Sequence, residues 1–273
     1  MKMLALAASL MLATAQDTTA DADLAAAIKA TAEKGFTYVI KPVADIPNFE
    51  SARDELAGAT VKGEYSGGVF HAQDGMFEIY RKGDKVAVKT QSGWLGYDAF
   101  TSPVKQAIKE AFEAEDGRRW RKGNVTKGRE ALSQLIRLDH LVHRANIERL
   151  TNLATAFSSI KRAGSPSIDG KPSVLYEGDL SDTAAFNILQ GPFDELVKRG
   201  NLSFQKVSGV GSLWIQEGLV RKVHARIGGK YTFYHEDDNA ERKGFCALGI
   251  TAEITKVGET KVDPPAEASK LLN

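Results

Sequence analysis

The chain has 273 residues, of which 36 are basic and 35 acidic, and 42% are hydrophobic. The balanced charge excludes a broad basic footprint for nucleic acid, and the hydrophobic content is sufficient for a full core. The single cysteine, Cys246, excludes an internal disulfide, so the stability of the fold has to come from packing.

The first residues are typical of a secretory signal peptide. Lys2 precedes an apolar run, Met3–Ala13, and Ala13-Thr14-Ala15 matches an A-x-A cleavage site. No cysteine follows the run, which excludes a lipid anchor at that point. We expect residues 1–15 to be removed and residues 16–273 to form a single soluble domain, periplasmic or secreted. Loss of Lys2 leaves 35 basic residues against 35 acidic ones.

The first half of the remaining chain predicts one helix followed by short strands. The helix is expected over Leu24–Lys34, and a strand over Phe36–Lys41 is expected to stop at Pro42. A meander should follow, because glycine-containing pairs punctuate short β-prone runs at hairpin spacing. Its expected strands are Thr60–Tyr65, Gly68–Ala72, Gly75–Arg81 and Lys85–Gln91, closed by Gly93-Trp94.

Helical periodicity replaces alternation in the middle of the chain. Ser102-Pro103 predicts the start of a helix that ends at Asp116-Gly117. Two further apolar stripes, divided by an N-cap at Asn146, predict helices on either side of that residue. The first stripe contains Leu132, Leu135, Ile136, Val142 and Ala145, and the second contains Ile147, Leu150, Leu153, Ala154, Phe157 and Ile160.

The last part of the chain predicts mainly strands. Within Ser212–Ile227, apolar residues alternate with Lys222, His224 and Arg226 after a glycine-containing turn, which predicts a hairpin with one apolar face. Further strands are expected over Val174–Gly178, Asn201–Val207, Lys230–His235 and Phe245–Lys256, with short helices after Ser181-Asp182, over Pro192–Lys198 and over Ala266–Leu272. An antiparallel sheet with one apolar face must be covered, and the mid-chain helices are the candidates. We therefore expect an α+β fold, a curved antiparallel sheet with helices over its concave face.

The sequence offers no convincing catalytic or metal-binding set. His140 and His143 lie three apart beside Asp139, but a metal site needs three or four converging ligands, so a surface or partly buried pair is the simpler interpretation. Ser158–Lys161 matches S-x-x-K without the S-D-N and K-T-G elements of that enzyme class. We expect no enzymatic activity, no metal and no cofactor.

A basic loop, Gly117–Arg129, separates the mid-chain helices. Arg118, Arg119, Arg121 and Lys122 surround Trp120 without an acidic residue nearby. Cations around an indole suit an anionic membrane surface or an acidic transfer partner. A merely solvated loop is the alternative.

Several local phrases resemble the LolA/LppX group of lipoprotein and lipid carriers. They are Asp169-Gly170-Lys171 with Val174–Ser181, the hairpin Leu213–Arg221, and the tail Val257–Pro265. The resemblance spans Leu24 to Leu272 and implies an incomplete antiparallel barrel whose open side is plugged by helices. It also implies a cavity for acyl chains, and hence a soluble periplasmic carrier of lipids or lipoproteins. The chain departs from the mycobacterial members in lacking the lipobox cysteine, and its mid-chain helical region is longer and more charged.

The resemblance also indicates which side chains would line such a cavity. The candidates are Tyr38, Phe77, Ile79, Val88, Trp94, Leu135, Val142, Leu150, Leu153, Phe157 and Trp214. The same aromatic side chains could instead fill a closed core. In that alternative, the chain is a non-enzymatic protein-binding or sensor module of the same fold.

Overall fold

The computed structural model describes residues 22–45, 60–113, 130–135, 137–139, 141–142, 156–190, 197, 202–235 and 240–273. Its first strands are β1 (Phe36–Asp45), β2 (Val61–Ser66), β3 (Val69–Gln73), β4 (Glu78–Lys82), β5 (Lys85–Thr90) and β6 (Gly93–Gly96). Later strands are β7 (Lys161–Gly164), β8 (Ser167–Ile168), β9 (Lys171–Pro172), β10 (Val174–Asp179), β11 (Leu202–Gln216), β12 (Leu219–His235) and β13 (Ala240–Thr255). The helices are α3 (Tyr97–Glu113), α7 (Asp182–Gln190) and α9 (Ala266–Leu272), and residues 22–32 form another helix. Residues 130–135, 137–139 and 141–142 are also helical, and we refer to them as the mid-chain helix.

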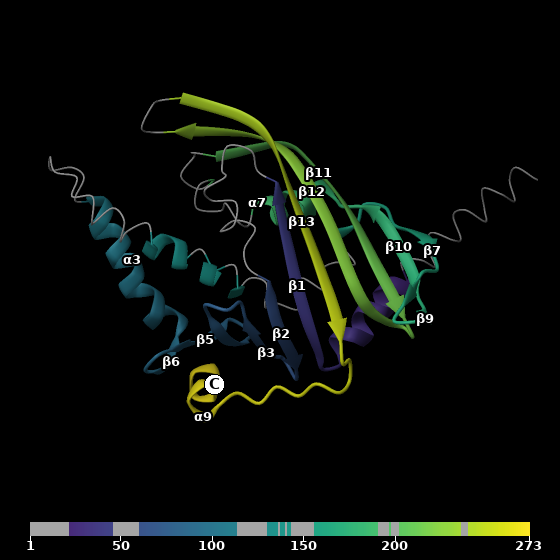
Figure 1. Cartoon of the computed structure of the whole chain (residues 1–273), viewed down its shortest axis with the longest axis horizontal. Helices are drawn as coiled ribbons and strands as arrows, with labels where there is room; N and C mark the ends of the chain where they lie inside the picture. The colour runs from purple at the N-terminus through teal and green to yellow at the C-terminus, as the bar shows by residue number, and fades with distance from the viewer. Residues whose placement is uncertain are drawn as a thin grey trace, which may run out of the picture.

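Eleven of the described strands form one antiparallel sheet in the order β6-β5-β4-β3-β2-β1-β13-β12-β11-β10-β7 (Figure 1). Its end strands, β6 and β7, are not paired with each other, so the sheet stays open. The long strands β11, β12 and β13 sweep across it and bend towards one end (Figure 1). Two-residue turns set the hairpin registers, as at Gly67-Gly68, where φ is 59° and 82°.

Strand β11 runs through a glycine-rich stretch that separates two predicted strands. Gly209–Gly211 falls between the strands expected over Asn201–Val207 and from Ser212, but it lies inside β11 and pairs with both neighbouring strands. A Cβ at Gly209 would lie 3.0 Å from Leu180 Cδ1, and one at Gly211 would lie 2.8 Å from the ring of Phe157. These glycines therefore permit close packing on the sheet and do not end the strand.

Strand β1 also continues past its predicted stop. Pro42 lies opposite Ile250 of β13, and the strand runs on to Asp45. Pairing with β2 ends at Ile40, so Pro42 lies where β1 is paired on one side alone in the described part of the sheet. A proline, which lacks the N–H, is tolerated at such a position.

Most of the described helices pack on the concave, inner face of the sheet. One buried cluster joins Leu24 and Ile28 of the helix at 22–32, and Leu138 and Leu141 of the mid-chain helix, to the inner residues of the strands. A second cluster joins Leu189 of α7 to β11, β12 and β13. The predicted curved antiparallel sheet with mid-chain helices over its concave face is confirmed.

The C-terminal helix α9 packs on the opposite, outer face. Ala268 and Leu272 are buried there against Tyr80 and Ala87 of β4 and β5. None of the helices in the described ranges is long and apolar enough to cross a membrane.

Two helix boundaries differ from the prediction. Helix α3 begins at Tyr97, so Pro103 lies inside it, because the first turn packs Phe100 edge-on against Phe77 at 5.9 Å. Phe157 was predicted to lie on a helix but forms an isolated β-bridge with Leu180. The segment is held beside β10 because Ser158 N donates to the Asp179 carbonyl at 2.9 Å.

Candidate ligand-binding face

The inner face brings together four of the predicted cavity residues. Tyr38, Phe77, Ile79 and Val88 all lie in one buried cluster, and Ile79 and Val88 are fully buried. Alternation along β1, β4 and β5 turns these side chains inward. The same cluster contains an aromatic group that the prediction missed: Phe36, Tyr65 and Phe70, with ring centroids 5.2 Å apart for Phe36–Tyr65 and 4.6 Å for Tyr65–Phe70.

The predicted cavity residues from the middle of the chain differ in how they contact this cluster. Val142 and Phe157 are partly buried and pack against the cluster, whereas Leu135 is partly buried and is not one of the residues packed against it. The helix turns Leu138 and Leu141, 0% and 1% exposed, towards the sheet instead. Their three-residue spacing was a usable signal for this face. Leu150 and Leu153 lie outside the described residues, as do the basic loop residues Arg118, Arg119, Trp120, Arg121 and Lys122, and the predicted signal peptide.

The two tryptophans predicted to line the cavity lie on the outer face. Trp94 packs with Tyr80 under α9, at a ring distance of 5.2 Å. Trp214 alternates with the inward Leu213 and Ile215, and Lys222 Nζ lies 5.0 Å from its ring centroid. The prediction was therefore wrong for both. For Trp214, period-two alternation along the strand was the signal that could have corrected it.

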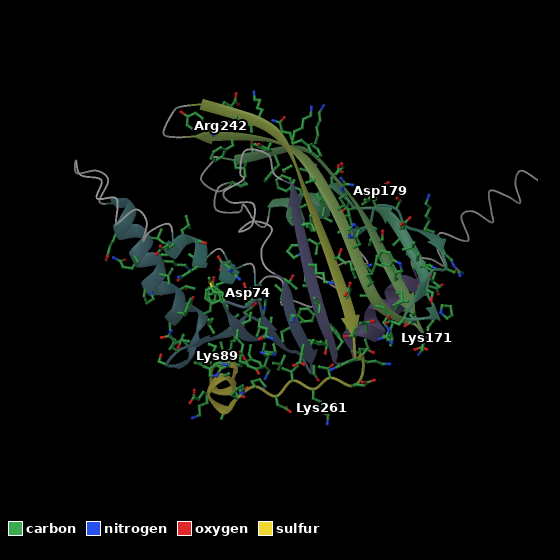
Figure 2. All side chains as sticks on the ribbon, in the orientation of Figure 1. Asp74, Lys89, Lys171, Asp179, Arg242 and Lys261 are labelled. Atoms are coloured by element: carbon green, nitrogen blue, oxygen red, sulfur yellow. The ribbon has the colours of Figure 1, made fainter. Side chains whose placement is uncertain are left out.

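Three polar contacts fasten the mid-chain helix to its neighbours: to the turn between β3 and β4, to β4 and to the start of α3. Arg137 Nε donates to Asp74 Oδ2 at 2.7 Å, and the side chain of Asp74 is only 3% exposed. Asp74 is labelled in Figure 2. Arg81 Nη1 donates to the Val142 carbonyl at 2.9 Å. Tyr97 donates its hydroxyl proton to Asp139. These contacts hold the apolar side of the helix on the concave face, and we refer to the Asp74–Arg137 pair as the helix latch.

A hollow of about 960 Å³ opens beside Phe157, between the strand edge at β7, β10 and β11 and Ala25 of the first helix. Phe157 and Ile160 supply apolar surface, and Ser158, Ser159, Lys161 and Glu177 supply polar groups. Phe157 also packs against both buried clusters of the inner face. The Phe157 hollow thus adjoins the apolar interior at one end and presents polar groups at the other.

One buried hydroxyl in this interior has no partner. Tyr38 is 5% exposed, and its Oη makes no hydrogen bond. Its ring lies over Gly63, where a Cβ would overlap it. Burial raises the pKa of Tyr38. A buried hydroxyl without a partner costs free energy, which an oxygen atom of a bound molecule would recover.

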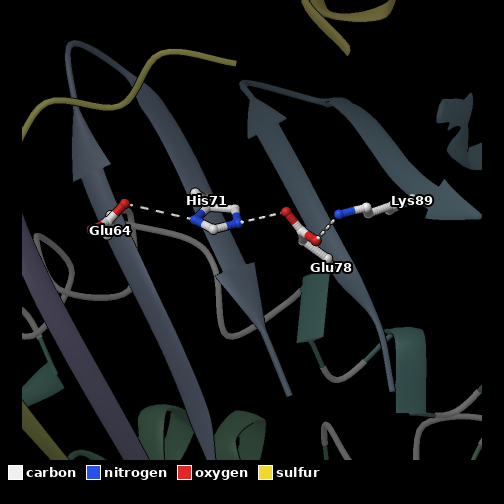
Figure 3. Close-up of polar contacts among 4 residues, drawn as sticks. All are labelled: Glu64, His71, Glu78 and Lys89. Carbon is white, nitrogen blue, oxygen red and sulfur yellow. Dashed lines mark hydrogen bonds and ion pairs between the residues drawn. The ribbon is translucent and has the colours of Figure 1, made fainter. Parts of the chain in front are cut away.

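On the outer face, Glu64, His71, Glu78 and Lys89 form a chain of polar contacts across the meander (Figure 3). His71 lies between Glu64 and Glu78, with Nδ1 3.7 Å from Glu64 Oε2 and Nε2 3.2 Å from Glu78 Oε1. Lys89 Nζ lies 2.7 Å from Glu78 Oε2. The two nitrogens of His71 face opposite carboxylates, so the group ties β2 to β5 and does not converge on one ligand.

We expect Glu78→Gln to lose stability at neutral pH by up to about 1 kcal/mol, as for a partly exposed ion pair. Burial pushes the pKa of Glu78 up, but hydrogen bonds from Lys89 and His71 outweigh it and hold the pKa below its usual value. A depressed pKa stabilises the fold above the unfolded-state value and loses that contribution as pH falls through the folded-state value. Urea unfolding should show the difference from wild type shrinking in acid. Glu64→Gln is the matched control, and a difference that grows in acid would contradict the assignment.

The described ranges also contain side chains of metal-ligating types and the single cysteine. No group of three or more His, Cys, Asp or Glu side chains there could hold a metal ion. His140 and His143 lie outside those ranges. Cys246 is 1% exposed, and burial raises the pKa of its thiol to about 11, which makes it unreactive at neutral pH.

An open, curved antiparallel sheet with helices packed in its concavity is the architecture that the sequence resemblance implied. The structure thus has the architecture that the resemblance to the LolA/LppX group predicted. Its inner face carries the apolar surface, and its outer face carries the two tryptophans, helix α9 and the chain of polar contacts in Figure 3.

Comparisons with known proteins find similarity at a low level only. No protein-family model and no curated protein sequence matches the chain. The lipoprotein LppX of Mycobacterium tuberculosis is 11% identical with a TM-score of 0.44, over 90% of this chain and 100% of that one. LprF of Mycobacterium bovis is 11% identical with a TM-score of 0.45, over 92% and 98%. A DUF1329 family protein of Desulfovibrio piger is 8% identical with a TM-score of 0.25, over 89% and 92%. The description of the fold rests on the strand order and packing of the chain itself.

Proposed function

We propose that this protein is a non-enzymatic carrier that binds the acyl chains of lipids or lipoproteins between the concave sheet and its helices. The observation that carries the proposal is the continuity of the inner face. Apolar side chains run from one buried cluster to the other, and Phe157 joins them at the mouth of the hollow. A volume of about 960 Å³ falls in the range of roughly 300–1,000 Å³ that ligand pockets occupy.

The physical drive for such binding needs no specific polar motif. Burial of a CH₂ group contributes about 0.8 kcal/mol, so a sixteen-carbon chain contributes on the order of 12 kcal/mol. This accounts for a binding face without a catalytic or metal set. The unpaired Tyr38 hydroxyl would donate to an ester or acid oxygen of the cargo.

The proposal includes export and membrane docking. The predicted signal peptide, residues 1–15, would direct the chain to the periplasm or outside the cell. The basic loop around Trp120 would then contact anionic lipid or an acidic transfer partner. Both regions lie outside the described residues, so these roles rest on the sequence.

Native mass spectrometry of protein purified from lipid-containing cells tests the proposal directly. We expect species heavier than the polypeptide by the masses of acyl lipids, and saturable binding of a fluorescent fatty acid after delipidation. A single species at the polypeptide mass, together with no saturable binding, would contradict the carrier role.

A Tyr38→Phe substitution separates the hydroxyl from the ring. Because the buried hydroxyl is unpaired, its removal should stabilise the empty protein by about 1 kcal/mol in urea unfolding. Affinity for a fluorescent fatty acid should fall by a similar free energy. Tyr65→Phe, in the same aromatic group, is the matched control. A loss of stability in Tyr38→Phe would mean that the hydroxyl has a partner in the empty protein.

A closed binding module of the same fold is the second candidate. It is favoured by Leu138 and Leu141, which fill part of the concavity and are almost completely buried. In this candidate the interior is a packed core, and a protein partner binds elsewhere. The same mass spectra distinguish the two, because a closed core carries no lipid.

A further inference from the structure

The outer face carries an apolar patch far from α9. Val210, Arg226, Gly249 and Val43 form one row across β11, β12, β13 and β1, since each is the register partner of the next. Their chain neighbours, such as Ile227 and Leu248, point into the inner core, so this row faces outward. Phe245 and Ala247 lie on the same outward face of β13 as Gly249, at positions two apart, and Phe245 adds an aromatic ring.

The patch is exposed. Val43, Val210 and Phe245 are 67%, 51% and 57% exposed, and they are three of the six large exposed hydrophobic side chains in the described ranges. The Phe245 ring lies over Gly228, where a Cβ would meet its Cζ at 2.5 Å. Gly228 therefore lets one side of the ring rest on the sheet, while the other side faces solvent. We refer to Val43, Val210 and Phe245, with this glycine and alanine floor, as the outer patch.

Cations accompany the outer patch. Arg226 lies in the centre of the row and Lys230 is the register partner of Phe245. Neither has an ion-pair partner in the described part of the chain. Lys243 is nearby and is neutralised by Glu241, at 3.0 Å. Asp179, the register partner of Val210, is the acid at one end of the row. The exposed apolar groups therefore have unpaired positive charge at their centre.

We propose that the outer patch is a docking surface for an anionic lipid bilayer. A bilayer interface accepts an aromatic ring and the aliphatic stems of Lys and Arg without a matching recess, and anionic headgroups neutralise the cations. A second copy of the chain fits less well. Two-fold pairing centred on the row would bring Arg226 against its own symmetry mate, and like charges repel across an interface. Val210 also lines the Phe157 hollow, so the test uses Phe245, Arg226 and Lys230, which do not line it.

The test is co-sedimentation of the whole protein with phosphatidylcholine vesicles, with and without phosphatidylglycerol. Wild type should bind the anionic vesicles, and binding should weaken as salt rises. Phe245→Ser should reduce affinity roughly tenfold, and Arg226→Ser and Lys230→Ser about fivefold each. Met76→Ser and Lys62→Ser change an exposed apolar and an exposed charged side chain outside the patch, and they should bind like wild type.

Two further measurements separate docking through the outer patch from docking through the basic loop and from self-association. A Phe245→Trp variant should retain vesicle binding, and its added fluorescence should be quenched by brominated lipid, because the side chain enters the interface. Absence of that quenching would overturn the proposal. So would patch variants that bind like wild type, if vesicle binding is instead abolished by replacing the basic loop residues with Ser, namely Arg118, Arg119, Arg121 and Lys122. Dimerisation of wild type that Phe245→Ser removes would also overturn it in favour of a self-association surface. Fatty-acid binding should stay unchanged in the patch variants, which separates this proposal from the carrier function.

Discussion

Replacing Asp74 by alanine is expected to lower the free energy of unfolding by about 3 kcal/mol. The carboxylate of Asp74 accepts hydrogen bonds from Met76 N at 3.0 Å, Phe77 N at 2.9 Å and Arg137 Nε at 2.7 Å. Alanine leaves all three donors without their acceptor, and the guanidinium loses its buried counter-ion. Denaturant unfolding of the purified variant measures the loss.

Two further variants divide this effect between the turn and the helix latch. Asp74→Asn keeps an acceptor for the two backbone N–H groups but removes the charge that pairs with Arg137. Arg137→Met leaves the turn intact and releases the helix. If the mid-chain helix covers an acyl site, Arg137→Met should also speed the exchange of a bound fluorescent fatty acid. Equal unfolding free energies for Asp74→Ala and wild type would show that the latch contributes nothing to stability.

Replacing Phe157 by alanine is expected to cost about 2 kcal/mol in the empty protein. A fully buried phenylalanine costs about 3–5 kcal/mol when truncated, because a cavity remains. Phe157 is only partly buried, and one side of it faces the hollow, so the loss should be smaller. Fatty-acid affinity or chain-length preference should change at the same time. A full-sized stability loss, with no lipid binding by wild type, would favour the closed module.

Gly211 provides an internal control for the position of that ring. A Cβ at Gly211 would lie 2.8 Å from Cε1 and Cζ of Phe157, so Gly211→Ala must displace the ring and should cost about 1–3 kcal/mol. In the Phe157→Ala background this clash is absent, and the second substitution should cost far less. The double-mutant cycle therefore measures the contact itself. Additive costs would mean that the ring does not rest on Gly211.

Much of the strand pattern could be predicted from the sequence because alternation and turn glycines are local signals. Apolar and polar residues alternate along Leu219–Ile227, and Gly67-Gly68 marks the turn of the β2–β3 hairpin. Tyr38, Phe77, Ile79 and Val88, which the resemblance suggested, lie in one buried cluster of the inner face. That they line a ligand cavity stays a prediction. Alternation also predicted a helical cover, since an apolar sheet face has to be buried.

The less accurate predictions concern places where packing overrides a local signal. Gly209 and Gly211 look like a bend, but they stay in β11 because Leu180 and Phe157 pack directly on them. Pro103 looks like a helix start, but the packing of Phe100 on Phe77 extends α3 back to Tyr97. Trp94 looks like an interior residue because of its size, but α9 covers it on the outer face.

The sequence by itself determined the class of the fold, the antiparallel pairing of neighbouring strands and the need for a cover on the apolar face. Periodicity and turn chemistry act within a few residues, and a sequence displays them directly. Only the tertiary structure decided the helix latch between Asp74 and Arg137, the unpaired hydroxyl of Tyr38 and the outer patch around Phe245. Each depends on groups that are distant in the chain and meet only when the sheet curves, so no local pattern encodes them.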